Sequence, residues 1–432
     1  MIRYQPLPTD FYKNNRARFA SNMQAGCAAV FYSNDVPPTN ADGTTYFRQN
    51  NDLLYLCGID QEETSLVIFP DSGLGRHKEI LFIQETNEEI LLWHGYKYTK
   101  EEAKAISGIE AVYYTHEMDR VLYQVIVEST GIYLNSNEHF RSVIEVETRE
   151  MRLGKALKNA FPYHQIYRSA PIMHELRYIK QASEVQMLEK AIQITNQAFH
   201  RILKMVKPGK MEFEVEAEII HEGVRNGCRN YGYLPIIASG ANACVLHYND
   251  NNNRIADGDL ILMDFGHEYG NYNSDLTRCV PANGKFSDRQ KAVYNAVLRV
   301  NNAATDLLVP GAKLDTYTAT VGKMVEEELI GLGLFTKADV AAQNPDKPLF
   351  RKYFAHGVSH SLGLDVHDVG SRFQAIVAGM VFTVEPGIYI REEGIGVRIE
   401  NNVLITNTKP LNLMRDIPIE VEHIEDLMQS GK

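Results

Sequence analysis

Three histidines lie within twelve positions of one short stretch, AHGVSHSLGLDVHDVG, which spans residues 355–370. The whole chain has 14 histidines in 432 residues, so this density is high for a polar loop. Imidazole nitrogen is a common ligand for divalent metals and a common carrier of protons. The spacing therefore suggests a metal site, which would need further ligands from other parts of the chain. The histidines concerned are His356, His360 and His367.

Four carboxylates that adjoin apolar runs could supply those ligands: Asp264, Asp275, Glu385 and Glu400. Carboxylates that converge without cations repel one another and raise one another's pKa values. Divalent ions remove this conflict, and four carboxylates with the imidazole of His360 suit two ions if one or two carboxylates bridge them. The set predicts metal-assisted hydrolysis. Its many oxygens and single imidazole favour Mn²⁺, with Co²⁺, Fe²⁺ or Zn²⁺ as alternatives.

Two of these acids end segments that are built on the same plan. Residues 258–266 (GDLILMDFG) and 379–387 (GMVFTVEPG) each have a glycine, an apolar run, an acid six residues after the glycine, and a second glycine. The echo predicts a pseudo-symmetric domain whose halves each bring a carboxylate to a shared centre. The alternative is two ordinary buried strands that end in turns. A carboxylate there would be costly to bury unless it were paired or bound to metal.

The first part of the chain has the pattern of a mixed α/β domain. Residues 64–70 and 79–84 have the length and the apolar, β-branched content of strands. Between such runs, residues 98–108 have a helical composition and a closing glycine. This alternation of short strands and helices predicts a sheet covered by helices.

The character of the chain changes near residue 175. Ser183 and Gln186 form a candidate capping box, and apolar residues recur after it at helical spacing until Pro208-Gly209. We expect the domain boundary at 172–176, which divides the chain into residues 1–173 and 174–432. The apolar positions of the expected helix are Met187, Leu188, Ala191, Ile192, Ile194, Ala198, Phe199 and Ile202.

Length and composition restrict the class of protein. A chain of 432 residues is too long for one core and predicts two domains, or three. The net charge of −11 argues against a nucleic-acid partner, and no apolar run approaches the ~20 residues that span a bilayer. Five cysteines without a CxxC pair, and a start without an apolar signal segment, predict reduced thiols in a cytoplasmic protein.

Four segments around the acids and histidines resemble those of a known group of enzymes. DFGHEYGNYNSDLTR, HGVSHSLGLDVHDVG, VFTVEPGIYI and VRIENN together resemble the pita-bread metallopeptidases, which include methionine aminopeptidase, prolidase and aminopeptidase P. This resemblance runs from about residue 175 to the C-terminus. Residues 44–59 (TTYFRQNNDLLYLCGI) resemble the companion domain of prolidase and aminopeptidase P, which methionine aminopeptidase lacks.

The resemblance implies an α/β (α+β) fold. An N-terminal creatinase/prolidase-like domain would precede a C-terminal pita-bread (creatinase/aminopeptidase) domain with pseudo-twofold symmetry. It also implies that two divalent ions are held, with Asp275 and Glu400 contacting both and Glu385 serving as ligand and general base. The implied metal ligands are Asp264, Asp275, His360, Glu385 and Glu400.

The resemblance also implies a substrate site. His356 and His367 match histidines that contact the peptide at the scissile bond, with His367 nearest the developing oxyanion. Arg398 matches a buried arginine that orients ligands, and alternation along a strand would put it on the same face as Glu400. Five further residues match substrate-site positions: Asp42, Trp93, Tyr233, His247 and Tyr389. For all of them except Asp42, packing in a core or a strand is the alternative.

The implied substrates are peptides with proline in the second position. Ser359 before the ligand histidine, together with DGTTYFRQNNDLLYLCG and ILLWHGYKYTKEEA, resembles the bacterial aminopeptidase P branch, with prolidase as the alternative. A homodimer or homotetramer is implied as well. Metal-free creatinase-like enzymes and non-catalytic relatives of the fold lack the ligand set, which is complete here. Cys279 and Asn401 depart from the usual pattern, and neither position is a ligand.

Overall fold

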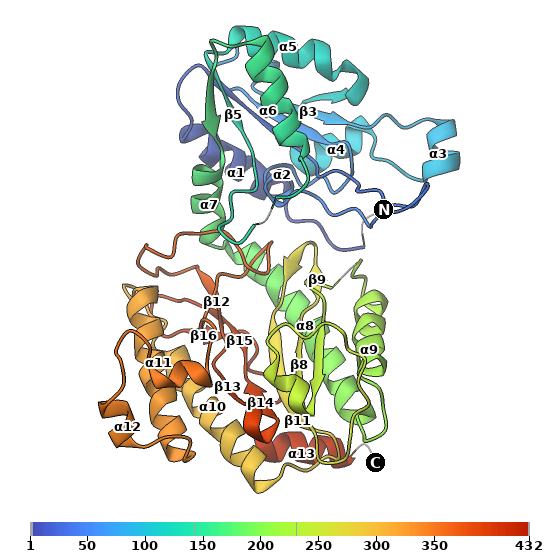
Figure 1. The fold of residues 1–432 in the computed structure, drawn as a ribbon. Coiled ribbons are helices and arrows are strands. Elements are labelled where there is room, and N and C mark those ends of the chain that lie inside the picture. The colour runs from blue at the N-terminus through green and yellow to red at the C-terminus, as the bar shows by residue number, and fades with distance from the viewer. Residues whose placement is uncertain (1–2, 143, 230, 431–432) are drawn as a thin grey trace. The chain divides into compact units, whose positions relative to one another are not determined.

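A computed structural model describes residues 3–142, 144–229 and 231–430 of the chain (Figure 1). The chain forms two compact units, Met1–Arg177 and Tyr178–Lys432. Residue 174, where we place the boundary from the sequence, lies inside a helix at the end of the first unit. Within the described ranges, no helix combines the length and the apolar character needed to cross a membrane.

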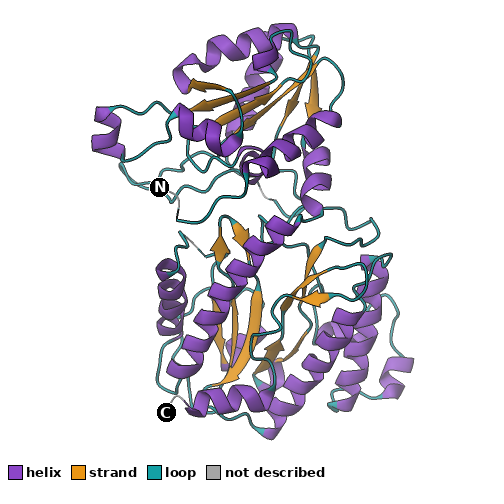
Figure 2. Ribbon diagram, turned by 180° about the vertical axis from the view of Figure 1, so that it is seen from behind, coloured by secondary structure: helices purple, strands orange, loops and turns teal. Residues whose placement is uncertain are grey.

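Unit 1 is a mixed sheet with helices packed around it (Figure 2). The strand order is β4-β3-β2-β1-β5-β6, in which β2 is antiparallel to both neighbours and the other pairings are parallel. The strands are β1 (Cys27–Tyr32), β2 (Ser65–Ile68), β3 (Glu79–Ile83), β4 (Ala111–Tyr114), β5 (Gly131–Leu134) and β6 (Gln165–Arg168). The helices are α1 (Thr9–Ser21), α2 (Asn51–Cys57), α3 (Glu88–His94), α4 (Lys100–Ser107), α5 (Met118–Glu128), α6 (Arg149–Ala160) and α7 (Ala170–Tyr178).

The local expectations for unit 1 are confirmed. The runs 64–70 and 79–84 contain strands β2 and β3, whose side chains are almost entirely buried. Helix α4 begins after Thr99, which forms a capping box with Glu102, and ends at Gly108 in the left-handed region with φ 71°. These elements form where the sequence signals are local, because caps and glycines act within one turn.

Unit 2 contains two small antiparallel sheets, ordered β11-β8-β7 and β12-β15-β16, with two further short hairpins. Helix α9 packs against β7 of the first sheet and against α8, which also contacts the β9–β10 hairpin, whereas α10 packs against β12 of the second sheet and α11 packs against α10 (Figure 1). The strands are β7 (Ile236–Ser239), β8 (Leu260–Phe265), β9 (Glu268–Tyr269), β10 (Tyr272–Asn273), β11 (Leu276–Pro281), β12 (Val381–Val384), β13 (Gly387–Ile390), β14 (Ile395–Arg398), β15 (Asn401–Leu404) and β16 (Leu411–Asn412). The helices are α8 (Ala182–Met205), α9 (Glu212–Arg225), α10 (Asp288–Asp306), α11 (Leu314–Gly331), α12 (Lys337–Ala341) and α13 (Val421–Ser430).

Helix α8 confirms the predicted periodic helix but corrects its start. The eight apolar residues expected on its inner face are all buried. The predicted capping box of Ser183 and Gln186 is wrong, because the helix begins at Ala182 and is capped by Gln181 with Glu184. The backbone N–H of Gln181 donates to the Glu184 carboxylate at 2.9 Å.

The two echo segments both form buried strands. Their leading glycines, Gly258 and Gly379, have φ of 86° and 92°, a backbone conformation that favours glycine. At the end of β8, a Cβ on Gly266 would lie 1.8 Å from the carbonyl oxygen of Ser274, so only glycine fits there. The glycines of the repeated pattern thus permit the turns that bring the acids to the ends of the strands.

Candidate metal centre

Each echo strand pairs with a second strand that also brings a carboxylate. In the β8–β11 pair, Asp264 lies opposite Thr277, and Asp275 immediately precedes β11. In the β12–β15 pair, Val384 lies opposite Asn401. Glu385 and Glu400 are therefore the next residues beyond that pairing. Each antiparallel pair presents two carboxylates at one end, as the pseudo-symmetric pattern predicts.

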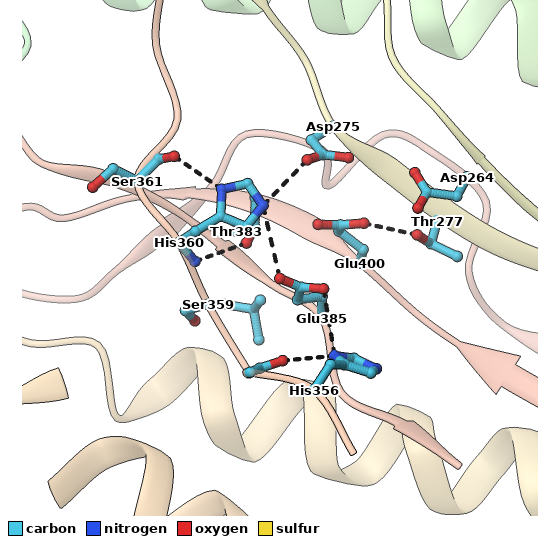
Figure 3. Close-up of polar contacts among 12 residues, drawn as sticks. Asp264, Asp275, Thr277, His356, Ser359, His360, Ser361, Thr383, Glu385 and Glu400 are labelled. Carbon is cyan, nitrogen blue, oxygen red and sulfur yellow. Dashed lines mark hydrogen bonds and ion pairs between the residues drawn. The ribbon is translucent and has the colours of Figure 1, made fainter. Parts of the chain in front are cut away.

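Three ligand-type side chains from different segments converge closely. Suitable donor atoms of Asp275, His360 and Glu400 all lie within 4.8 Å of one another. His360 Nε2 lies 3.3 Å from Asp275 Oδ2 and 3.7 Å from Glu385 Oε1 (Figure 3). The other ring nitrogen of His360, Nδ1, lies 2.9 Å from the carbonyl oxygen of Ser361. A proton on Nδ1 would donate to that carbonyl and leave the Nε2 lone pair facing the carboxylates.

Asp264 joins the same group through two shared partners. The hydroxyl of Tyr233 lies 2.5 Å from Asp264 Oδ1 and 2.5 Å from Asp275 Oδ1. Arg398 Nη2 donates to Asp264 Oδ2 at 2.5 Å. All five residues that the sequence suggests as metal ligands are therefore neighbours in one buried region of unit 2.

The carboxylates are short of positive charge. Burial raises the pKa of Asp264, and the charge of Arg398 only partly opposes it. Burial likewise raises the pKa of Glu385 to about 7. Burial raises the pKa of Glu400 well above its ordinary value, and the charges of Asp275, Glu385 and Asp264 raise it further. A set of crowded, desolvated carboxylates with one imidazole fits divalent cations, which would compensate this charge.

Thr277 is a central residue that sequence reasoning missed. Its hydroxyl donates to Glu400 Oε2 at 2.7 Å and accepts from Arg398 Nε at 3.0 Å. The argument that Arg398 and Glu400 share one continuous strand is wrong, because β14 ends at Arg398 and β15 begins at Asn401. The two side chains still meet at the Thr277 hydroxyl. Alternation from Asp275 places Thr277 on the same face and is the signal that could have revealed it.

Asn402 is a second residue that sequence reasoning missed. Its side chain accepts from the backbone N–H of Asp275 at 3.1 Å and donates to the Asp275 carbonyl at 2.7 Å. This paired contact ties the Asp275 segment to the strand that follows Glu400. No local pattern in the sequence marks it, because the two residues are 127 positions apart.

Comparisons with known proteins agree with this geometry. A sequence profile described as "Metallopeptidase family M24" matches residues 186–407, and one described as "Aminopeptidase P, N-terminal domain" matches residues 12–133. The Xaa-Pro aminopeptidase of Haemophilus influenzae is 34% identical over 98% of both chains, and that of Escherichia coli is 33% identical over 98% of both. The chain belongs to metallopeptidase family M24.

Solved structures of M24 relatives match the whole fold. Zinc-substituted aminopeptidase P from E. coli, in complex with product, has a TM-score of 0.88 at 31% identity and covers 99% of this chain and 100% of that one. The aminopeptidase of Pseudomonas aeruginosa has the same TM-score at 30% identity, with 99% of each chain covered. The predictions of an α/β chain with an aminopeptidase P-like N-terminal domain and a pita-bread domain are confirmed, and so is the metallo-aminopeptidase class.

Within this M24 site, His356 is held as a neutral imidazole. Burial lowers its pKa to about 3, and the charge of Arg398 acts in the same direction. Nδ1 lies 2.7 Å from the carbonyl oxygen of Gly357, and Nε2 lies 2.7 Å from the hydroxyl of Tyr389. Arg398 Nη1 donates to that same hydroxyl at 2.9 Å. Tyr389 therefore links the guanidinium to the imidazole, which packing alone would not require.

The other two predicted substrate histidines are placed differently. The ring of His367 packs edge-on against that of His360, with centroids 4.3 Å apart and planes at 79°. His247 is exposed in the loop after the short helix Gly240–Cys244, so the alternative that it is a core histidine is wrong. Its contribution to a substrate site remains a prediction.

Asp42 and Trp93 belong to unit 1. Both are exposed, and Trp93 is 74% accessible on helix α3, a helix without buried residues. The alternative that Trp93 is a core residue is therefore wrong. Their contribution to a substrate site remains a prediction.

Proposed function

We propose that this chain is a dinuclear-metal aminopeptidase that releases the N-terminal residue from peptides with proline in the second position. The observation that carries this proposal is the convergence of Asp264, Asp275, His360, Glu385 and Glu400 from separate segments of unit 2. Similarity to Xaa-Pro aminopeptidases over 98% of the chain supports the substrate preference.

The five side chains would hold the two ions between them. Asp275 and Glu400, which both belong to the closest group of donor atoms, would be the ligands shared between the ions, as the family resemblance implies. Oxygen ligands with a single imidazole favour Mn²⁺, with Co²⁺, Fe²⁺ or Zn²⁺ as alternatives. Second contacts from Thr277, Arg398 and Ser361 orient the ligands, as such contacts do in metal sites generally.

The chain's own groups suit the steps of peptide hydrolysis. Two divalent ions at such a site supply Lewis acidity and make a water molecule acidic near neutral pH. Glu385 would accept the proton of that water and deliver it to the leaving nitrogen. His367 would donate a hydrogen bond to the oxyanion that develops on the scissile carbonyl. His356, kept neutral and oriented by Tyr389, would contact the peptide beside Glu385, whose Oε2 lies 3.7 Å from its ring.

The proline of the proposed substrate explains why the enzyme needs contacts to the scissile carbonyl and a proton donor for the leaving nitrogen. A bond before proline is a tertiary amide, so its nitrogen carries no N–H that an enzyme could bind. Recognition must then come from the carbonyl, the pyrrolidine ring and the free α-amino group. A histidine-lined site next to a carboxylate that carries protons meets the first of these needs.

The decisive experiment compares three substrates on one preparation. The protein is stripped with a chelator, reloaded with Mn²⁺, and given an Xaa-Pro-Yaa tripeptide, an Xaa-Pro dipeptide and an Xaa-Ala-Yaa tripeptide. We expect Mn²⁺-dependent release of the first residue from the Xaa-Pro-Yaa peptide. Cleavage of the dipeptide alone would make the enzyme a prolidase. Cleavage restricted to the alanine peptide would refute the proline preference, and activity without metal would refute the metal mechanism.

We also propose that the enzyme acts as a homo-oligomer in the cytoplasm. Leu92 and Trp93 on α3 are 78% and 74% exposed, and adjacent large apolar side chains of this kind often mark interaction surfaces. All five cysteines are free, as befits a reducing compartment. Light scattering after size exclusion distinguishes dimer from tetramer, and a monomer at micromolar concentration would refute the oligomer.

A further inference from the structure

Lys180 and Asp368 form an ion pair inside unit 2 that the proposed reaction does not use directly. Lys180 Nζ lies 2.9 Å from Asp368 Oδ2, and each side chain is 1% exposed. Lys180 stands two residues before helix α8, whereas Asp368 directly follows His367. An ion pair so deeply buried contributes little to stability compared with apolar side chains of the same size. Its location beside a substrate histidine suggests another role.

The pair closes the loop that carries two histidines of the site. Residues 360–368 begin at His360 and end just after His367, and the Asp368 N–H donates to the Ser361 carbonyl at 2.9 Å. A Cβ on Gly363 would lie 2.2 Å from Asp368 Oδ2 and 2.9 Å from Lys180 Cε, so the loop wraps tightly around the pair. Closure of this loop brings the rings of His360 and His367 into edge-on contact.

Lys180 is itself held by the framework of unit 2. Its backbone N–H donates to the carbonyl of Gly379 at 2.8 Å, at the start of the echo segment that leads to Glu385. Its ammonium also donates to the carbonyl of Tyr178 at 3.4 Å. Nearby, the buried Glu184 accepts bonds from the Gln181 N–H and the Tyr272 hydroxyl. Lys180 is therefore anchored just before α8 to the carbonyls of Tyr178 and Gly379, and Gly379 lies at the start of the segment that leads into β12.

We propose that Lys180 and Asp368 are positioning residues for peptide cleavage. Their ion pair ties the end of the 360–368 loop to the start of α8 and so fixes the His367 ring where it can reach the oxyanion. This inference rests on the proposed function of His367. A displacement of a reacting group by about 1 Å costs on the order of 100-fold in rate, so a tether at the adjacent residue has a large effect.

The kinetic test uses Lys180→Met, Asp368→Asn and the double variant, each saturated with Mn²⁺. We expect Lys180→Met to lower kcat on the order of 100-fold with KM changed less than about threefold. Each single variant leaves one buried charge without its partner, whereas the double variant removes both charges. The melting temperature of the double variant should therefore lie closer to that of the wild type than those of the single variants do, while its kcat stays low. Recovery of both stability and kcat in the double variant would show a merely structural pair and overturn the proposal.

A second readout does not depend on activity. Hydrogen exchange of the 358–370 segment in metal-free protein should be faster in the double variant than in the wild type. Without the ion pair the loop opens more often, and the hydrogen bond from the residue 368 amide to the Ser361 carbonyl is broken more often. The matched control is Arg177→Met, which breaks the buried pair between Arg177 Nη1 and Asp52 Oδ1 at 2.8 Å within unit 1. We expect that variant to lose stability without faster exchange in 358–370.

The two readouts separate this inference from the proposed function. Unchanged exchange of the 358–370 segment in the double variant would overturn the tether whatever the kinetics show. A wild type that fails to cleave Xaa-Pro peptides would refute the proposed function, and the exchange measurement would then still decide whether the pair closes the loop. If Lys180→Met alone does not fold, Asp368→Asn and the double variant carry both tests.

Discussion

The two antiparallel strand pairs of unit 2 bring carboxylates to the candidate metal centre, and the carboxylates of each pair have different neighbours. Asp264 and Asp275, from the β8–β11 pair, share the hydroxyl of Tyr233, and Asp264 also accepts from Arg398. Glu385, beyond the β12 end of the other pair, instead faces the rings of His356 and His360 at 3.7 Å. In the first pair both carboxylates accept from fixed donors, although Asp275 also lies 3.3 Å from His360 Nε2. In the second pair Glu400 accepts from the Thr277 hydroxyl, whereas Glu385 faces two imidazoles. We therefore expect the carboxylates of the first pair to hold metal ions and Glu385 of the second pair to transfer protons.

The largest effect should come from removing the reactive carboxylate of the second half. Glu385→Gln keeps the shape of the side chain but cannot accept a proton, so we expect kcat on Mn²⁺-loaded enzyme to fall on the order of 1000-fold. Steady-state kinetics on an Xaa-Pro-Yaa peptide measures this. The control is Glu392→Gln at the exposed pair with Lys352. A near-normal rate for Glu385→Gln would remove this residue as the general base and end the contrast between the halves.

A smaller effect should follow from removing the hydroxyl that joins the halves. Thr277→Val removes the hydroxyl that donates to Glu400 and that accepts from Arg398 Nε. Because outer contacts of this kind tune metal affinity, we expect Mn²⁺ to bind about 10- to 100-fold more weakly. Calorimetric titration of metal-free protein measures the affinity. Thr305→Val, which removes a hydroxyl bonded to the Asn301 carbonyl on α10, is the control and should leave it unchanged.

The pH dependence of the free energy of unfolding should show where Glu385, in the second pair, gains and loses its proton. Burial raises the pKa of Glu385 from 4.5 to about 7, so the folded metal-free protein holds a proton that the unfolded chain releases. The stability that Glu385 contributes is therefore present below about pH 4.5 and is lost as pH rises through about 7. Melting curves of metal-free wild type and Glu385→Gln measure it, and the decline should be shallower in the variant. Equal slopes would show that Glu385 does not titrate in this range. Glu184 has a similarly raised pKa and cancels in the comparison.

The smallest effect is expected at Cys279, where the chain departs from the usual pattern. Its thiol is fully buried and lies 3.5 Å from the carbonyl oxygen of Arg398. Threonine at this position has a hydroxyl that can donate to the same carbonyl, so Cys279→Thr should change kcat/KM less than about twofold. Assays at saturating Mn²⁺ measure this. A larger loss of kcat/KM would mean that activity depends on the packing of strand β11 as strongly as on the ligands.

Local features of the fold could be predicted from the sequence, because their signals act over a few residues. The apolar run of β8, the glycine before it and the acid at its end belong to one short segment, and the periodic face of α8 lies on one helix. The suggested ligand residues could be found because each acid follows or precedes such a run.

Contacts between distant segments could not be predicted in the same way. Lys180 meets Asp368 across 188 positions, and Asn402 meets Asp275 across 127. Polar residues of these types are usually exposed, so nothing local distinguishes a buried partner from a surface one. The interruption between β14 and β15 was missed because the run around Glu400 has strand composition throughout.

The buried cysteines have a practical consequence for following how each unit opens. Cys27 and Cys57 lie in unit 1, whereas Cys228, Cys244 and Cys279 lie in unit 2, and all five are buried. Burial raises the thiol pKa of Cys57 and of Cys279 to about 12, so neither reacts readily while its surroundings stay closed. Alkylation followed by peptide mass spectrometry therefore measures the rate at which each unit opens, without any engineered label.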